Sequence, residues 1–210
     1  MEFEQLKKKL NLPEDEPESN WHRHENAPLH LDTRLGGWVQ NTATVSPLAY
    51  VAPDAIVRDH AQVFDYSLIC DEAQVSGNAV IGEPGLCLAA VILDDAHVSG
   101  NARIEVGAKV GGRSEITDDA VIGNNARICG QSRVSGHAAI SGNYRFDSIV
   151  ADEDTVISSE SLSAIGIADT GSTVSMERLS QAESNAKGHM RTQRSRRAQA
   201  ARDQTKGHDR

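Results

Sequence analysis

Aliphatic residues recur every six positions along the central part of the chain, and this spacing predicts its structure. The recurring residues are Val39, Val45, Val51, Val57, Val63, Ile69, Val75 and Ile81, and then, after a slip, Ile92, Val98, Ile104, Val110, Ile116, Ile122, Ile128, Val134, Ile140 and Phe146. A small residue precedes nearly every one by two positions, as Ala43 precedes Val45 and Ala96 precedes Val98. Because residues two apart in a strand point to the same side, each such pair is expected to face inward.

Short polar turns separate these inward-facing pairs. Ser76-Gly77-Asn78 and Ser99-Gly100-Asn101 are typical, and their Gly and Asn residues tolerate the positive φ of a sharp corner. One short strand and one corner make a six-residue unit, and three units close a triangular coil of about 18 residues, with coils stacked about 4.8 Å apart. The pattern predicts a parallel β-helix of about six coils over residues 38–158.

In segments such as VSGNAV and VSGNAR, the chain resembles the hexapeptide-repeat family. The resemblance implies an all-β fold, a single-stranded left-handed parallel β-helix. Many members of the family are acyltransferases that move an acyl group from a CoA-type donor to a small hydroxyl or amine acceptor. They use a histidine as general base, at sites between the subunits of a trimer. For this chain the resemblance implies acyl-CoA as a possible co-substrate, no bound cofactor and a homo-oligomer.

Three histidines are candidates for the catalytic base. His97 precedes Val98 and is expected to point outward from a flat face, whereas His60 and His137 lie in turns. His60 and His137 are twelve units apart, which places them four coils and about 19 Å from each other, so they do not share a metal ion within one chain. The family also contains zinc carbonic anhydrases, but the typical histidine cluster is absent, and we expect no metal.

A catalytic assignment is weakened by the lack of a long acceptor loop, because the only interruption of the repeat is the short apolar segment 87–91. The alternative is a non-catalytic scaffold or protein-binding module that self-associates and recruits partners through its tails. Fold-level analogy alone does not decide between these functions.

Outward positions read at a spacing of 18 residues show one apolar face. The six residues in its two columns are Tyr50, Leu68, Leu86, Ala52, Cys70 and Leu88. Such a patch on a soluble chain favours self-association, and the family resemblance suggests a trimer. The alternative is that the N-terminal arm or the C-terminal segment of the same chain covers this face.

The flanking segments divide the chain into three parts. Residues 1–37 are predicted to form an arm and cap, with a short amphipathic helix over residues 2–12 that presents Phe3, Leu6 and Leu10. Within this arm, His22 and His24 together with His30 could hold a metal ion or could simply pack in a cap. Residues 159–210 are a polar extension with a basic tail from residue 187, which is expected to be disordered.

Composition adds limits on function. The net charge is −9, but residues 187–210 contain eight Lys or Arg and two Asp, so residues 1–186 carry −9 − 6 = −15. An acidic body argues against general nucleic-acid binding by the folded part, whereas the tail could contact an acidic partner, RNA or anionic lipid. The absence of a long apolar run and of an apolar leader predicts a cytoplasmic protein with no membrane span. Three cysteines without metal-type spacing fit a reducing compartment.

Overall fold

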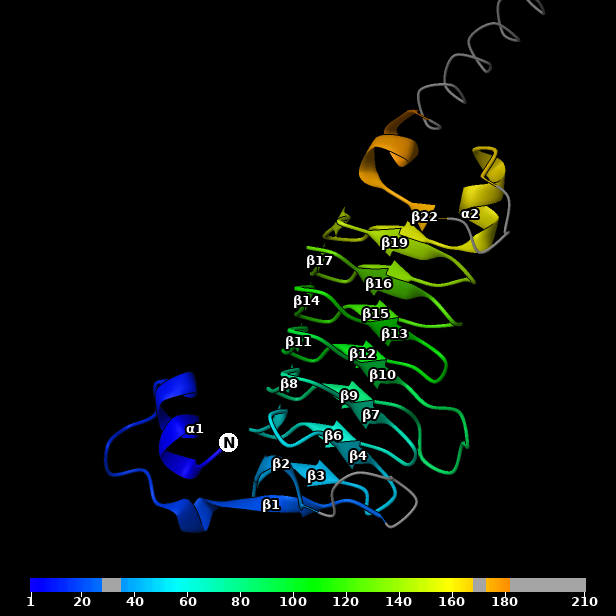
Figure 1. The fold of residues 1–210 in the computed structure, drawn as a ribbon. Coiled ribbons are helices and arrows are strands. Elements are labelled where there is room, and N and C mark those ends of the chain that lie inside the picture. The colour runs from blue at the N-terminus through cyan, green and yellow to red at the C-terminus, as the bar shows by residue number, and fades with distance from the viewer. Residues whose placement is uncertain (28–34, 168–172, 182–210) are drawn as a thin grey trace, which may run out of the picture.

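The chain forms a parallel β-helix in which short strands wind around a three-sided prism (Figure 1). The computed structural model describes residues 1–27, 35–167 and 173–181. Three sheets form the faces of the prism, and each contains seven parallel strands. One of the sheets has an eighth strand, which is antiparallel to its neighbour. The predicted all-β parallel β-helix is confirmed, with about seven coils, and this topology is compatible with the left-handed winding that the resemblance implies.

The strands fall into three sheets, A, B and C. Sheet A contains β1 (Trp21–Glu25), β2 (Leu35–Gln40), β5 (Ile56–Val57), β8 (Gln74–Val75), β11 (His97–Val98), β14 (Glu115–Ile116), β17 (Arg133–Val134) and β20 (Val150–Ala151). Sheet B contains β3 (Thr44–Val45), β6 (Gln62–Val63), β9 (Val80–Ile81), β12 (Arg103–Ile104), β15 (Val121–Ile122), β18 (Ala139–Ile140) and β21 (Val156–Ile157). Sheet C contains β4 (Tyr50–Val51), β7 (Leu68–Ile69), β10 (Val91–Ile92), β13 (Lys109–Val110), β16 (Arg127–Cys129), β19 (Arg145–Asp147) and β22 (Thr173–Val174).

The core consists of the predicted inward-facing pairs. Val75 and Val98 lie in register on neighbouring strands and are fully buried, as are the small residues Ala73 and Ala96 two positions before them. Where serine takes the small position, its hydroxyl is satisfied locally: Ser114 Oγ donates to the Gly111 carbonyl at 2.7 Å. The narrow interior therefore accepts one small and one branched side chain per face.

Aspartates in the left-handed conformation form several corners of the prism. Asp94 and Asp118 have φ of 59° and 58°. In each case the carboxylate accepts a backbone N–H of the next coil, from Gly112 at 2.7 Å and from Gly136 at 3.0 Å. This hydrogen bond between neighbouring coils offsets the cost of a positive φ in a residue other than glycine.

One insertion interrupts the repeat between β9 and β10. Asn101 and Asp119, which are hydrogen-bonded on neighbouring coils, are 18 residues apart, whereas Asn78 and Asn101 are 23 apart. The five extra residues form a loop that bulges from the prism between β9 and β10 (Figure 1). Val91, which the sequence pattern includes in the irregular segment, belongs to β10.

The N-terminal arm packs on the outside of sheet A. The predicted helix is confirmed as α1 (Phe3–Leu10), and it is followed by a 3₁₀ turn (Glu18–Asn20) and by β1, which pairs antiparallel with β2. Phe3 and Leu6 form a separate apolar cluster with Trp21, Trp38 and Ile56. The described part of the arm therefore covers the first coils of sheet A rather than the apolar positions on sheet C.

The C-terminal end of the prism is covered by α2 (Ser159–Ala164), whose Leu162 is buried in the main core. The β-helix also extends past the predicted boundary at residue 158, because β22 pairs with β19 and places Val174 beside Phe146. The strands after Phe146 depart from the six-residue spacing, and for this reason the repeat pattern predicts fewer coils. The basic tail from residue 187 lies outside the described residues.

Candidate functional site

The three candidate histidines lie at separate places on the surface. His97 is exposed on sheet A, between Gln74 and Glu115 on the neighbouring strands. His60 and His137 are exposed in the turns after β5 and β17, which stand four strands apart in sheet A. The structure thus places all three as the sequence predicts, and it does not bring any two of them together.

His137 is the one histidine of the three with carboxylates beside its ring in the described structure. Its Nε2 lies 3.6 Å from Asp119 Oδ2, and its Nδ1 lies 3.9 Å from Asp154 Oδ1. Two carboxylates on opposite sides of the ring can orient the imidazole. The side chain of His137 is 72% exposed, so solvent screens these interactions strongly.

The two described histidines of the arm, His22 and His24, hydrogen-bond to residues of the first coil. His24 is buried, and its Nε2 lies 3.0 Å from the Ala49 carbonyl; His22 Nδ1 lies 2.8 Å from Asn41 Oδ1. His30, the third member of the possible metal site, lies outside the described residues. Within the described parts of the chain, no group of three or more His, Cys, Asp or Glu side chains is arranged to hold a metal ion.

Sheet C is apolar on its outer surface in its N-terminal half. Tyr50, Leu68 and Val91 lie in register on β4, β7 and β10, and each is partly exposed. Ala52 and Cys70 follow the first two strands, as the sequence predicts, and Leu93 takes the corresponding position after β10.

Leu86 and Leu88 are not members of these columns, which corrects the prediction from a spacing of 18 residues. The insertion precedes β10, so the positions expected for Leu86 and Leu88 are taken by Val91 and Leu93. Leu86 and Leu88 lie instead in the inserted loop, at the edge where sheet B turns into sheet C, and are 42% and 63% exposed.

The same edge of the prism is apolar in the two preceding coils. Leu48 lies in the turn between β3 and β4, and Tyr66 lies in the turn between β6 and β7; both are exposed. We call the surface formed by these turn residues and the outer residues of three sheet C strands the apolar patch; its members are Leu48, Tyr50, Tyr66, Leu68, Leu86, Leu88 and Val91.

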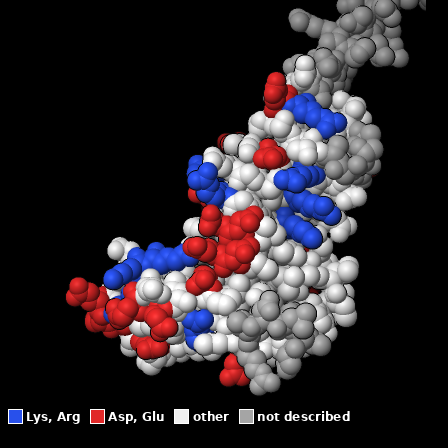
Figure 2. Space-filling model, in the orientation of Figure 1, with Lys and Arg blue, Asp and Glu red and all other residues white. Residues whose placement is uncertain are grey.

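The C-terminal half of sheet C carries positive charge. Lys109, Arg127 and Arg145 stand in register on β13, β16 and β19, directly beyond the apolar strands, and all three are exposed. Figure 2 shows Lys and Arg side chains gathered in a column over the upper part of the prism, with Asp and Glu side chains gathered nearer the arm. This basic column is absent from the sequence predictions, although reading the outward positions at a spacing of 18 residues finds it directly.

Cys129 lies within the basic column. Arg145 Nε donates to Cys129 Sγ at 3.2 Å, and this hydrogen bond raises the pKa of the Arg145 guanidinium above its usual value. The Cys129 thiol in turn donates to the Phe146 carbonyl at 3.2 Å. Of the other cysteines, Cys70 is half-buried and Cys87 is exposed in the inserted loop.

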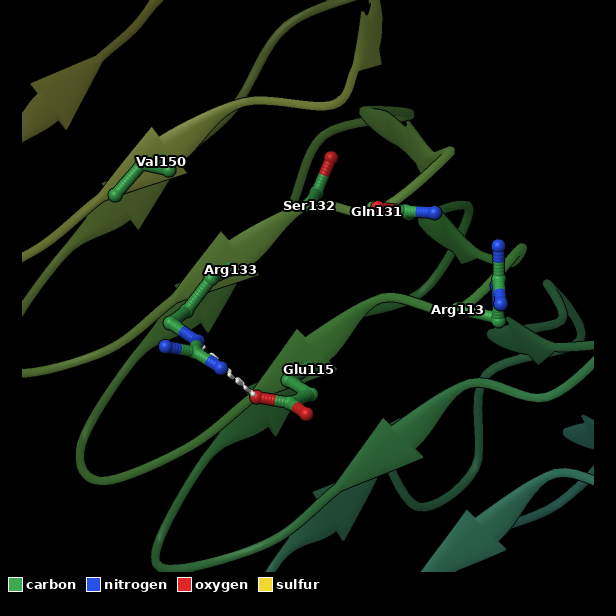
Figure 3. A pocket seen from close by; sticks show the side chains of 6 residues that line it. All are labelled: Arg113, Glu115, Gln131, Ser132, Arg133 and Val150. Atoms are coloured by element: carbon green, nitrogen blue, oxygen red, sulfur yellow. Dashed lines mark hydrogen bonds and ion pairs between the residues drawn. The ribbon is translucent and has the colours of Figure 1, made fainter.

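Sheet A carries a polar depression of about 400 Å³, lined by Arg113, Glu115, Gln131, Ser132, Arg133 and Val150 (Figure 3). Arg133 donates to Glu115 Oε2 through Nε at 3.1 Å and through Nη2 at 2.8 Å, so one guanidinium and one carboxylate already satisfy each other. The depression therefore offers a ligand less unpaired charge than the basic column does.

The comparisons with known proteins do not extend these observations. In the parts of the chain that the structure describes, no helix combines the length and apolar character needed to cross a bilayer. Comparison of the chain with protein-family models, with curated proteins and with solved structures finds no match.

Proposed function

We propose that the protein is a β-helical scaffold that self-associates through the apolar patch. The observation that carries the proposal is the stacking of exposed apolar residues on one edge and one face over three successive coils. Single exposed apolar residues are normal, but a contiguous patch of this kind is typical of an interaction surface.

A second copy of the chain is the occupant that fits this surface. The face is straight because its strands β4, β7 and β10 stack in register, so two prisms can lie side by side along their length. The resemblance to the hexapeptide-repeat family favours three copies arranged in a ring. Such a ring closes when the apolar patch of each copy contacts a different face of the next copy.

Light scattering of a loop variant tests this proposal. Leu86→Glu/Leu88→Glu places two charges in the patch, and both side chains are exposed, so the fold of the single chain is expected to remain intact. Val156→Glu is the matched control, because Val156 is 63% exposed on sheet B, away from the patch. We expect the wild type and the control to have the mass of three chains and the loop variant the mass of one. A wild type that is monomeric, or a loop variant of unchanged mass, contradicts the proposal.

Acyl transfer is the second candidate, and the position of His137 beside Asp119 and Asp154 favours it. In such a reaction the imidazole takes the proton of an acceptor hydroxyl or amine, the acceptor oxygen or nitrogen forms a bond to the acyl carbon, and the CoA thiolate leaves and is reprotonated. The family resemblance would place acceptor and donor between subunits, so this activity would depend on the same assembly.

An acyl-CoA consumption assay with amine and hydroxyl acceptors tests the enzymatic function. His137→Ala is compared with His60→Ala, a matched change on the same edge of the prism, where the described residues provide no carboxylate within ion-pair distance. Acyl transfer that is lost in the first variant and kept in the second supports catalysis by His137. Activity that both variants retain excludes His137 as the base and returns attention to His97.

The basic C-terminal tail is proposed to bind partners of the scaffold. Residues 187–210 carry eight Lys or Arg against two Asp, and a basic segment attached to an acidic body is suited to an acidic partner. Deletion of residues 187–210 is expected to abolish binding to such a partner and to leave the mass of the assembly at three chains.

A further inference from the structure

Three cations, Lys109, Arg127 and Arg145, stand in a straight column on sheet C. Lys109 is in register with Arg127, and Arg127 with Arg145, so neighbouring side chains start about 4.8 Å apart. Within the described parts of the chain, none of the three forms an ion pair. Like charges directly opposite one another on adjacent strands are destabilising, and this column contains two such contacts.

The described strands of the other two faces do not carry such a column. On sheet A, the corresponding outward positions carry Glu115, Arg133 and Val150, and Arg133 pairs with Glu115 at 2.8 Å. On sheet B, Arg103 is followed by Val121 and Ala139 at the outward positions of the next two strands. The run of like charges is therefore a property of one face and does not follow from the repeat.

Two carboxylates near the column accept hydrogen bonds from corner residues of the prism. Asp94 Oδ2 accepts the backbone N–H of Gly112 at 2.7 Å, and Asp147 Oδ1 accepts the hydroxyl of Ser148 at 2.9 Å. These hydrogen bonds hold the two carboxylates to the corner of the prism. The guanidinium of Arg127 and the ammonium of Lys109 remain available to an external anion.

Space for an anion exists on both sides of Arg127 and Arg145. One depression of about 240 Å³ is lined by Lys109 and both arginines, by Leu93 and Cys129, and by the single carboxylate of Asp94. A second depression of about 420 Å³ extends from the same arginines toward Asn143 and Thr173. The column thus borders surface hollows rather than projecting from a convex surface.

We infer that the basic column binds a short linear oligophosphate aligned with the prism axis. Three cations on adjacent strands span about 10 Å, which is the scale of a few linked phosphoryl groups. Guanidinium groups donate two parallel hydrogen bonds to phosphoryl oxygens, and a lysine ammonium adds a compact point charge. A flat, repetitive face suits a linear chain of identical charged groups better than a compact ligand that needs an enclosing pocket.

The same surface disfavours nucleic acid. Proteins that bind single strands stack bases on exposed aromatic rings, but Tyr144 and Phe146, the aromatic residues beside the column, are 1% and 0% exposed. The net charge of −9 also repels a long polyanion that extends beyond the column. Both features favour a ligand limited to a few phosphates.

Calorimetric titration of the full chain with inorganic tripolyphosphate tests this inference. We expect saturable binding that weakens steeply with added salt, and Arg127→Gln/Arg145→Gln is expected to weaken it by at least about tenfold. Arg103→Gln is the matched control, because Arg103 is an exposed arginine at the equivalent strand position of sheet B. Since residues 187–210 are also basic, the comparison between these variants is what isolates the column from the tail.

Orthophosphate and a deoxythymidine oligonucleotide complete the titration. Weaker binding of orthophosphate than of tripolyphosphate supports recognition of a linear chain of charges. Equal binding of orthophosphate, tighter binding of the oligonucleotide, or an unchanged affinity in the double arginine variant overturns the inference. Light scattering of each variant shows whether the assembly is intact, so failure of self-association and failure of anion binding are observed separately.

Cys129 provides a reporter at the site itself. In a Cys70→Ser/Cys87→Ser background, tripolyphosphate is expected to slow alkylation of the remaining thiol, because the ligand covers the surface that Cys129 shares with Arg145. Adding Arg127→Gln should remove the protection, and adding Arg103→Gln should preserve it. Alkylation that is equally fast with and without tripolyphosphate places the anion elsewhere and contradicts the inference.

Discussion

Lys9 of α1 forms an ion pair with Glu72, in the turn between β7 and β8, with 2.8 Å between Nζ and Oε2. The Glu72 side chain is 62% exposed, and an exposed pair of this kind contributes up to about 1 kcal/mol. Leu6, on the same helix, is fully buried in the cluster that contains Trp38 and Ile56. Burial of a leucine stabilises by about 1.5–3 kcal/mol, so apolar packing holds the arm more strongly than the ion pair does.

Replacement of these two residues is therefore expected to have unequal effects. Leu6→Ala should lower the free energy of unfolding of the arm by about 2–4 kcal/mol, through lost burial and the cavity left behind. Lys9→Ala should lower it by less than about 1 kcal/mol. Hydrogen exchange of β1 and α1 amides measures both changes. If Lys9→Ala releases the arm as readily as Leu6→Ala does, electrostatics rather than packing attaches it.

The interior of the β-helix is the part of the fold that the sequence predicts best. A buried position between stacked coils accepts few side chains, so Val75, Val98 and their small partners recur at a fixed spacing that is visible without a structure. The docking of α1 on sheet A is not predictable in this way, because amphipathic spacing shows that a helix needs a partner surface and does not say which one. Ile56, an apolar residue at an outward position, is the signal that could have indicated it.

Two adjacent alanines at the start of β18, Ala138 just before the strand and Ala139 its first residue, test the narrow interior. Ala138 is fully buried, whereas its neighbour Ala139 points outward and is partly exposed. Ala138→Leu should overpack the core and lower the free energy of unfolding by about 1–3 kcal/mol, while Ala139→Leu should change it by less than about 0.5 kcal/mol. Urea denaturation monitored by circular dichroism measures the difference. Equal effects of the two changes would show that the inward direction of Ala138 is wrong.

The surface is less predictable than the core because it depends on where the insertion begins. The spacing is regular on both sides of the interruption, but the pattern alone leaves the position of the extra residues open. Ala90, a small residue two positions before Ile92, marks the true start of the next strand and places Val91 outward beside Leu68. Assigning Leu86 rather than Val91 to the outward position of β10 misplaces the apolar column by the length of the inserted loop.

The corner aspartates combine a hydrogen bond with an unusual backbone conformation, and Asp118 allows the two to be separated. Asp118→Ala removes the acceptor for the Gly136 N–H and leaves a residue with no local hydrogen bond at φ of 58°. The expected loss of stability is about 2–3 kcal/mol. It combines the cost of the left-handed conformation in alanine with the cost of an unpaired Gly136 N–H, each of about 1 kcal/mol or more. Asp118→Asn retains an acceptor and tolerates the conformation, so it should lose less than about 1 kcal/mol in the same urea assay. Comparable losses in both variants would indicate that charge, rather than geometry, is what the corner requires.

The thiols of Cys70 and Cys87 should differ in reactivity. Burial, followed by the nearby negative charge of Asp71, raises the pKa of the Cys70 thiol above its ordinary value. A raised pKa reduces the thiolate fraction at pH 8, and the thiolate is the reacting species. Iodoacetamide followed by mass spectrometry is expected to label exposed Cys87 at least about tenfold faster than Cys70, with the Cys70 rate still rising above pH 9. Faster labelling of Cys70 would contradict its burial on sheet C.

Deletion of residues 85–89 tests whether the insertion serves the fold or the surface. The shortened segment, GEPAVI, has the same pattern as the regular unit SPLAYV that ends at Val51, so β9 and β10 should remain connected by an ordinary corner. The deletion removes the hydrogen bond from Gly107 N–H to the Ala89 carbonyl, but the shorter loop costs less entropy to close. We therefore expect an unchanged circular dichroism spectrum and a thermal midpoint within a few degrees of the wild type. Because Leu86 and Leu88 are lost with the loop, the mass in light scattering should fall from three chains to one. A folded deletion variant that keeps the mass of the wild type would contradict self-association through the apolar patch.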